Sequence, residues 1–449
     1  MRLDLCGSDL QNWTAPLQYG GNADEEVYMH MSKVLESPRP PDGLPTLSYD
    51  TEEWARNHYA VLAQYRELDP VHPAPIEDPV TKRSFTFWRL FRYDDVAVVL
   101  KDPRFVRELE TVFGSTKSMV APKWPNLQES WTNWMLLRDP PDHTRLRTLI
   151  NQAFTPRMVE NLRTRVEQIT DGLLDALSGE PEVDVIPSFA FALPVIVIAE
   201  MLGVPAEDRA LFRDWSRPIA RALGPVGEGD LVQADDAIGE AREYLREIVQ
   251  QRRRSPRQDL VSALIEARDE NGRLTETELV DNCILLLVAS HETTVNLIAN
   301  GLWLLMKHAD QLALLRKSPD LYPDLVEEVL RYEPSVQSTA RIAAEDVVIR
   351  DRTIRKGDRL VLWLAAANRD PVKFENPDEF QIDRHPNRPL TFGGGIHHCL
   401  GAPLARLEGV VALQRFVRRF PNFSWADTQA VWQPDLMFRS LRELRVRLS

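Results

Sequence analysis

The spacing of apolar residues predicts that most of this chain is helical. Apolar side chains recur at helical intervals over residues 54–68 and stop at Asp69-Pro70, which predicts a helix that ends there. From about 142 to 308 nearly every stretch shows the same periodicity. Proline and turn residues interrupt this long helical region, at Pro156, Pro187, Pro205 and Ser255-Pro256.

A smaller number of segments have the pattern of strands. Aromatic residues alternate with polar ones over 84–91, and short apolar runs occur at 347–349 and 360–363. Asp94-Asp95 followed by the apolar run 96–100 predicts a short capped helix. The whole pattern therefore predicts a fold that is mainly α with a minor β portion.

One predicted helix is unusually long. Thr275 and Glu278 fit a capping box, and helical sequence continues from there to about His308. At about 1.5 Å per residue this helix is roughly 50 Å long, enough to cross the whole domain. Burying an unpaired polar group costs free energy, so the polar residues in its apolar middle need a reason. They are Ser290, His291, Glu292, Thr293 and Thr294.

Two segments lack periodicity. Residues 1–45 are polar and end in a proline-rich stretch, which predicts an N-terminal extension. Residues 369–398 are rich in Asp, Asn, Pro and Gly, and irregular loops this long inside compact domains are usually functional. No other boundary is visible, so we expect an extension over 1–45 and a single domain over 46–449.

Charge and cysteine content narrow the possible partners and location. The chain has 54 basic and 67 acidic residues, a net charge of −13, which repels nucleic-acid phosphates and anionic lipid surfaces. Three cysteines, Cys6, Cys283 and Cys399, are too few for a disulfide framework. The longest apolar run, 283–289, is far shorter than the roughly 20 residues that cross a bilayer. We expect a soluble, cytoplasmic protein without a nucleic-acid or membrane partner.

The strongest local motif is the glycine-rich segment 392–401, which ends in Cys399-Leu400-Gly401 just before a predicted helix. Glycines permit positive φ and close approach to a flat ligand. The positive end of the following helix dipole favours a thiolate. The residues alone also allow a buried free thiol. A phosphate-binding loop is excluded, because the segment lacks the lysine and serine of that motif and no strand directly precedes it.

The segment resembles the haem-binding motif of the cytochromes P-450, a family with a trigonal-prism bundle of helices around haem b. The matching residues are Phe392, Gly395, His397, Cys399 and Gly401. The resemblance implies that Cys399 is the axial ligand of the haem iron and that His397 contacts a haem propionate. It also implies that Phe392, Gly401 and, on the long helix, Ala289 lie against the haem.

The middle of the long helix resembles the acid–alcohol pair with which the same family activates oxygen. By that resemblance Glu292 delivers protons and Thr293 hydrogen-bonds the dioxygen, in a locally opened turn of the helix. Ser290 stands where the family usually has glycine. The residues alone favour a plainer interpretation, in which His291 and Glu292 lie on a solvated stripe and the threonines bond back to the preceding turn.

Two further sets of residues match the family in the right order along the chain. Glu328 and Arg331 share one helix face, and with Arg384 they match a structural network that holds the irregular segment. His143, Arg147 and Arg341 match cationic contacts to the haem propionates, which need such partners when buried. Each cation alone would be an ordinary surface residue.

The resemblance implies a monooxygenase that inserts one oxygen atom of O2 into a small, largely apolar organic molecule, by hydroxylation or epoxidation. No flavin or reductase segment is present, so electrons are expected from a separate ferredoxin or flavodoxin. That protein would dock near Cys399, where arginines could offset the net negative charge. Alternatively, these arginines form only an ordinary solvated helix face. They are Arg406, Arg415, Arg418 and Arg419. A haem-thiolate isomerase, dehydratase or peroxygenase is an alternative, but such relatives tend to lose the pair kept here as Glu292-Thr293. A non-catalytic haem sensor is a third alternative, but a sensor would normally carry a partner domain and none is visible in this sequence.

The substrate itself is not predicted. Segments expected to line its pocket are 106–134, 190–250, 335–337 and the turn 436–438, with candidate contacts at Trp131, Val288, Val336, Met437 and Phe438. Trp134 is a further aromatic candidate, although aromatic residues there could equally be core. Lys117 and Lys123 suit either a carboxylate on the substrate or plain surface positions. We expect a monomer.

Overall fold

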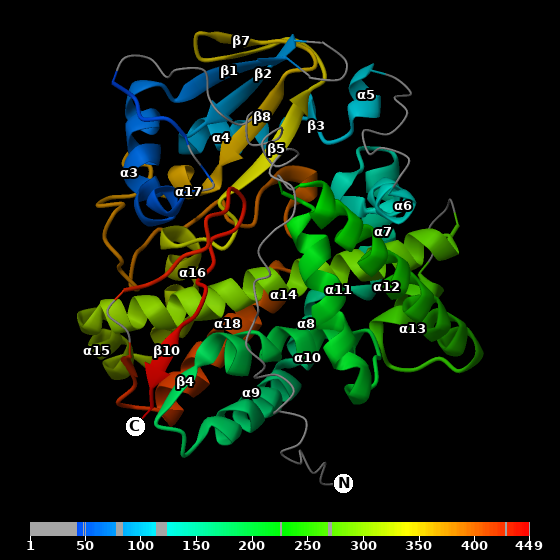
Figure 1. Ribbon diagram of the computed structural model, residues 1–449, viewed down its shortest axis with the longest axis vertical. Coiled ribbons are helices and arrows are strands. Elements are labelled where there is room, and N and C mark those ends of the chain that lie inside the picture. The colour runs from blue at the N-terminus through cyan, green and yellow to red at the C-terminus, as the bar shows by residue number, and fades with distance from the viewer. Residues whose placement is uncertain are drawn as a thin grey trace.

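The computed structural model describes residues 43–47, 49, 51–77, 84–113, 124–224, 227–267, 272–426 and 429–448. Residues 1–42 of the predicted extension, and Lys117 and Lys123, lie outside these ranges. A small sheet lies at one end of the molecule, and helices fill the rest around one long central helix, α14 (Figure 1). The predicted class, mainly α with a minor β portion, is confirmed.

The α-helices follow the predicted periodicity closely. They are α3 (Glu52–Leu68), α4 (Tyr93–Val99), α5 (Leu109–Phe113), α6 (Pro125–Asn133), α7 (Asp142–Ala153), α8 (Pro156–Asn161), α9 (Arg163–Leu177), α10 (Ala192–Met201), α11 (Arg209–Arg221), α12 (Glu228–Arg254), α13 (Leu260–Glu266), α14 (Glu276–Lys307), α15 (Ala309–Lys317), α16 (Tyr322–Tyr332), α17 (Leu364–Ala367) and α18 (Ala402–Arg419). The shorter helical turns are η1 (Met135–Leu137), η2 (Ile186–Ala190), η3 (Ala206–Asp208), η4 (Pro319–Leu321) and η5 (Gly395–His397), of which η2 is a π-helix.

The predicted breaks in the helical region are found, each for its own reason. Pro156 opens α8 behind the cap residue Thr155, as suits a proline in the first turn. Pro187 lies inside the π-helix η2, and Pro205 precedes η3. Ser255 ends α12. The sequence missed only a three-residue strand, Glu182–Asp184, in this region.

The principal sheet has the strand order β1-β2-β8-β5-β3. Its edge strand β1 contains Pro73 and Pro75, which suits an edge because proline cannot donate to a second neighbour. Val71 pairs with Leu90 at one end of the antiparallel β1–β2 ladder. The strands are β1 (Val71–Glu77), β2 (Ser84–Leu90), β3 (Phe105–Val106), β4 (Glu182–Asp184), β5 (Ser338–Ala343), β6 (Val347–Ile349), β7 (Arg352–Ile354), β8 (Arg359–Trp363), β9 (Ser424–Trp425) and β10 (Arg445–Arg447).

Helix α4 differs slightly from the prediction. It starts at Tyr93 with Arg92 as a cap residue that makes no side-chain bond, so Asp94 and Asp95 are not caps. They lie instead in the first turn, where negative charge interacts favourably with the helix dipole.

Helix α14 organises the helical part of the molecule. Its capping box is confirmed: the Glu278 amide donates to Thr275 Oγ1 at 3.2 Å, and the Thr275 amide donates to Glu278 Oε2 at 2.9 Å. It contacts α10, α12, α16 and α18. By length and composition it could cross a membrane, but 72% of its most apolar window is buried inside the protein. This burial is what a core helix requires.

A buried ion network holds the irregular stretch 369–398 against α16. The side chains of Glu328 and Arg331 are fully buried. Arg331 donates to both carboxylate oxygens of Glu328, Nε to Oε2 at 2.8 Å and Nη2 to Oε1 at 2.7 Å. Arg384 donates from Nε to the same Oε1 at 3.3 Å. The structure therefore brings together the three residues that the sequence analysis grouped.

The two arginines of this network also bind the backbone of the irregular stretch. A guanidinium has five donors in one plane, so it can hold a carboxylate and several carbonyl groups together. Arg331 donates to the carbonyl oxygens of Asn368, Pro377 and Glu379, and Arg384 to those of Glu375, Asn376 and Glu379.

A second buried carboxyl, Glu408 on α18, has no such partner. Its side chain is buried, and Oε2 makes no hydrogen bond within the described part of the chain. Burial raises the pKa of Glu408 from its ordinary 4.5 to about 8, because the interior disfavours the charged form. Glu408 is therefore protonated in the folded protein at neutral pH.

Replacing Arg331 with Ala should lower the free energy of unfolding by about 3–5 kcal/mol, because the Glu328 carboxylate would stay buried without its main partner. Chemical denaturation measures this loss. Arg163→Ala is the matched control, since it breaks another i,i+3 Glu–Arg pair whose side chains are 44% and 64% exposed. Equal losses in the two variants would show that the buried network contributes no more to the free energy of unfolding than an exposed ion pair.

The buried Glu408 carboxyl should make stability depend on pH. Because its folded-state pKa is raised, its stabilising effect is complete below the unfolded-state pKa and is lost as pH rises toward about 8. Between pH 6 and pH 8 the wild type should lose about 2 kcal/mol more than Glu408→Gln. Denaturation curves at the two pH values test this, and parallel losses in both proteins would refute it.

Candidate active site

An accessible stretch in the middle of the buried helix α14 marks an internal hollow. Residues 279–288 and 294–305 of α14 are buried, whereas Ala289, Ser290, Glu292 and Thr293 keep accessible surface. These residues lie between two buried stretches of the central helix α14 (Figure 1), and the accessible space beside them is the hollow. Val288 precedes them and is buried.

The hydroxyl groups in this stretch all bond to the helix itself. Thr293 Oγ1 donates to the Ala289 carbonyl oxygen at 3.1 Å, and Thr294 Oγ1 to that of Ser290 at 2.9 Å. Ser290 Oγ donates to the Leu287 carbonyl oxygen at 3.2 Å. The expected locally opened turn is absent, since α14 is a continuous α-helix over Glu276–Lys307. Back-bonding satisfies the hydroxyls without a distorted backbone.

His291 does not lie on a solvated stripe, as the plainer interpretation held. It is fully buried, and its Nδ1 lies 3.2 Å from the Leu287 carbonyl oxygen. Its Nε2 is 3.8 Å from Glu292 Oε2. Burial lowers the pKa of His291, so the imidazole is neutral at neutral pH. Glu292, in contrast, is part-exposed, with 30% of its side chain accessible.

The glycine-rich loop is shaped by its close packing on the end of α4. Gly393 and Gly395 have φ of 69° and 65°, a region that side chains rarely adopt. A Cβ atom at Gly395 would overlap the Leu100 carbonyl oxygen. The loop then turns back, and the Cys399 amide donates to the Phe392 carbonyl oxygen at 2.9 Å. Only glycine therefore fits at position 395.

The Cys399 side chain also faces the interior hollow. It keeps accessible surface, yet the surrounding protein is dense enough for burial to raise the pKa of its thiol. The amides of Gly401 and Ala402 and the charge of Arg147 act in the opposite direction and favour the thiolate. A metal cation bonded to the sulfur would favour the thiolate further and outweigh the cost of burying its charge.

Cationic side chains crowd the same region. His143 and His397 pack with ring centroids 4.4 Å apart, and Arg341 lies on β5 within the sheet. Burial and mutual repulsion lower the pKa of Arg341 to about 9 and that of His397 to about 2. Arg147 donates to the His398 carbonyl oxygen at 2.9 Å, which places it beside the cysteine loop.

Arg107 belongs to this cationic group and was missed by the sequence analysis. Burial lowers its pKa to about 10, and its charge acts on both Arg341 and His397. It follows strand β3 and matches no motif, so only the tertiary fold reveals it. Its backbone amide donates to Asp139 Oδ2 at 2.9 Å, which fixes its position.

Several polar atoms of the cationic group have no hydrogen-bond partner in the described part of the chain. They are both ring nitrogens of His143, Nε2 of His397 and Nε of Arg107. Buried donors of this kind need partners, and two carboxylates would satisfy them and relieve the repulsion. No set of three His, Cys, Asp or Glu side chains among the described residues could hold a metal alone. The site thus fits an anionic macrocycle whose iron takes one thiolate.

The predicted substrate residues after α16 and near the C-terminus lie together beside α14. Ser335 Oγ donates to the Thr293 carbonyl oxygen at 2.7 Å. Val336 and Phe438 form an isolated antiparallel bridge, and the Gln337 backbone amide donates to the Met437 carbonyl oxygen at 2.7 Å. These contacts bring Val336, Met437 and Phe438 close to the Glu292-Thr293 pair.

The two candidate tryptophans differ in their surroundings. Trp134 is fully buried, with no accessible surface, and belongs to the hydrophobic core. Trp131 is only partly buried and packs against that core, so it keeps surface for another contact.

The arginines considered for a docking surface are mostly paired. Arg406 pairs with Glu327, Arg415 with Glu167 and Asp171, and Arg419 with Asp175. Arg418 is exposed. These acidic partners on α9 and α16 offset much of the positive charge that the sequence suggested.

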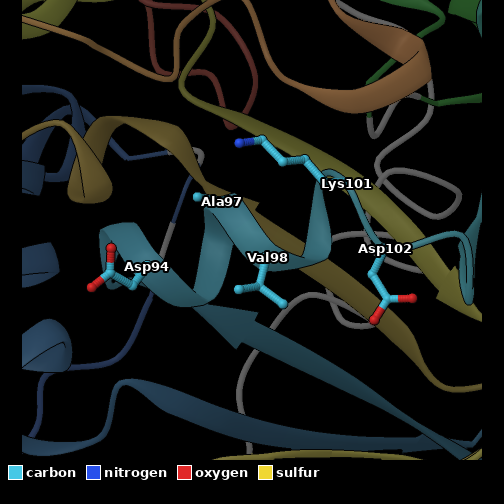
Figure 2. Close-up of a pocket in the computed structure, with 5 residues that line it drawn as sticks. All are labelled: Asp94, Ala97, Val98, Lys101 and Asp102. Carbon is cyan, nitrogen blue, oxygen red and sulfur yellow. The ribbon is translucent and has the colours of Figure 1, made fainter.

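An open surface depression of about 550 Å³ lies over α4, next to the end of the helix that packs on the glycine-rich loop (Figure 2). Its lining residues are Asp94, Ala97, Val98, Lys101 and Asp102. None of the candidate catalytic side chains is among them, so it is separate from the hollow beside α14.

Comparison with known proteins gives consistent relatives. A sequence model of the family described as Cytochrome P450 matches residues 219–319 and 320–439. The polyketide biosynthesis cytochrome P450 PksS of Bacillus subtilis is 39% identical over 406 residues, which cover 89% of this chain and 97% of that protein. The cytochrome P450 monooxygenase PikC of Streptomyces venezuelae is 40% identical over 402 residues, 88% of this chain and 92% of that protein.

Among solved structures, P450BioI in complex with an acyl carrier protein ligated to hexadec-9Z-enoic acid has a TM-score of 0.81. It is 38% identical in sequence, and the match covers 89% of this chain and 99% of that chain.

Proposed function

The chain belongs to the cytochrome P450 family of haem b monooxygenases, and on that premise we propose that Cys399 is the thiolate ligand of the haem iron. The observation that carries this proposal is the position of Cys399: an accessible sulfur inside the protein, on a glycine loop, next to the cationic group. Haem held by this thiolate would supply the activation of O2 that, with two electrons and two protons, puts one oxygen atom into an organic substrate and releases the other as water.

The cationic group would hold the two haem propionates. His143 and His397 carry buried ring nitrogens without a partner among the described residues, and the positive charges of Arg107 and Arg341 repel each other. Charge-assisted bonds to carboxylates would neutralise this repulsion. Phe392, Gly401 and Ala289 would lie against the flat faces of the macrocycle, where small or flat side chains permit close approach.

Glu292 and Thr293 would deliver protons during oxygen activation. Glu292 is partly accessible in the hollow, so its carboxyl can exchange protons with water there. Thr293 Oγ1 donates to its own helix in this structure; rotation about one side-chain bond would free that donor for dioxygen. A hydroxyl in this position can hold a proton at Oγ1 and pass it on.

The substrate proposed is a small, largely apolar molecule that undergoes hydroxylation or epoxidation. Val288, Val336, Met437, Phe438 and Trp131 are the proposed contacts, and the first four surround the Glu292-Thr293 end of the hollow or adjoin it. Electrons would come from a separate ferredoxin or flavodoxin docking on the Cys399 side, where Arg418 and Arg419 are exposed. We further propose a cytoplasmic monomer.

Carbon monoxide binding tests the proposed iron ligand. The reduced wild-type holoprotein should show the strongly red-shifted Soret band of a thiolate-bound haem, and Cys399→His should lose it. Cys283→Ala is the control, because Cys283 is buried in α14 with its pKa raised to about 12 and should leave the band unchanged. A histidine-type band in the wild type would refute the proposal.

Substitution of Thr293 tests the proton pathway. Thr293→Ala should lower product formed per electron consumed by at least about tenfold and release hydrogen peroxide instead, because a positioned proton donor contributes at least this much. Thr294→Ala is the matched control: its hydroxyl is part of the same helix but bonds to Ser290 in a buried position. Product yield and peroxide are measured together, with a substrate found from its effect on the Soret band. Equal coupling in the two variants would exclude the role of Thr293.

A further inference from the structure

One carboxylate in the region of the predicted substrate pocket has no place in the proposed mechanism. Asp435 lies at the start of the turn that carries Met437 and Phe438. Its Oδ1 accepts hydrogen bonds from the amides of Met437 at 2.6 Å and Phe438 at 2.8 Å. These two bonds fix the orientation of the carboxylate. Its second oxygen, Oδ2, makes no hydrogen bond in the part of the chain that the structure describes.

Asp435 lies close enough to Glu292 for the two carboxyl groups to interact electrostatically. It keeps accessible surface, yet burial is the strongest influence on its pKa, which is raised. The negative charge of Glu292 raises that pKa further, and the positive charge of Arg221, at the end of α11, lowers it. Asp435 is therefore within electrostatic reach of both the Glu292-Thr293 pair on α14 and the end of α11.

The turn that carries Asp435 is held rigidly against α14. Phe438 bridges to Val336, Met437 accepts from Gln337, and Ser335 bonds to the carbonyl oxygen of Thr293. Each link is a backbone or short side-chain contact, so the Asp435 carboxylate keeps a fixed place relative to Thr293. A group with such a fixed place can orient a bound molecule.

The charge of Asp435 is not neutralised by the protein. Arg221 forms its ion pair with Asp230 at 3.1 Å, and 52% of its side chain is exposed. Glu292 adds charge of the same sign. The neighbouring side chains Val336, Met437 and Phe438 are apolar. A carboxylate in such surroundings is costly unless an opposite charge comes close to it, and a carboxylate-bearing ligand would be repelled.

We propose that Asp435 binds a cationic nitrogen of the substrate and so determines which end of the molecule faces the Cys399 side of the hollow. This inference rests on the proposed function and narrows it to amphipathic substrates with an apolar body and a positively charged group. The apolar body would lie against Val336, Met437 and Phe438, and the cation would contact Asp435 Oδ2.

Binding of three probes with the same chain length tests this assignment. Dodecyltrimethylammonium, dodecanol and dodecanoate share one hydrocarbon tail, and the quaternary nitrogen cannot ligate iron. Calorimetric titration of the holoenzyme should give a dissociation constant for the cation about tenfold lower than for dodecanol, as expected for one charge interaction of this kind. Dodecanoate should bind most weakly.

Asp435→Asn isolates the charge, because the amide oxygen still accepts from Met437 and Phe438 and the turn is kept. This variant should bind dodecyltrimethylammonium about tenfold more weakly and dodecanoate more tightly, with dodecanol unchanged within about twofold. Asp351→Asn, which removes a charge whose side chain is 84% exposed, is the control and should leave all three dissociation constants unchanged.

The proposal is overturned if Asp435→Asn leaves all three dissociation constants unchanged or shifts all of them equally. Unchanged binding with reduced product per electron would instead make Asp435 a second proton donor. The carbon monoxide band is recorded on the same samples: if it is red-shifted while the preference for the cation is absent, the proposed function stands and this inference fails. A missing band would count against the proposed function itself.

Discussion

The buried Glu328 carboxylate is the constraint on which the rest of the site depends. A charge without accessible surface must be paired, and Arg331 and Arg384 pair it. The same two guanidinium groups donate six hydrogen bonds to five carbonyl groups within 368–379, whose peptide groups would otherwise need water. A long, mostly irregular loop is thereby held against α16 and supports the segment that presents Cys399.

The side chains gathered near the Cys399 loop form a group in which positive charge predominates. Arg107, His143, Arg341 and His397 come from separate elements, and burial lowers the pKa of each; the charge of Arg107 lowers the pKa of the other three further. Such a cluster is unfavourable by itself and favourable around two carboxylates. Holding these side chains together lowers the stability of the fold, and functional sites commonly carry such a cost.

The polar residues in the middle of α14 belong both to the central helix of the fold and to the candidate site. Its polar middle is compatible with a continuous helix because each hydroxyl bonds to a carbonyl one turn earlier. The helix is therefore stable without the bulge that the resemblance suggested, and Ser290 in place of glycine takes part in this bonding. The Glu292 carboxyl in the same stretch differs from these hydroxyls, because 30% of its side chain is accessible.

The sequence by itself determined the helical class, the capping box at Thr275 and the strand at 84–90, because these depend on local periodicity and on side chains three or four residues apart. It also identified Cys399 and the catalytic candidates, because their residue types follow one another in a recognisable order. The sequence could not identify Arg107 and Asp435, because neither lies in a motif. Their interest comes from neighbouring groups that are distant along the chain. The burial of His291 and Trp134, and the pairing of Arg406 and Arg415, were decided in the same way. Which side chain faces water, a partner or the internal hollow depends on packing between distant elements, and only the tertiary structure decides it.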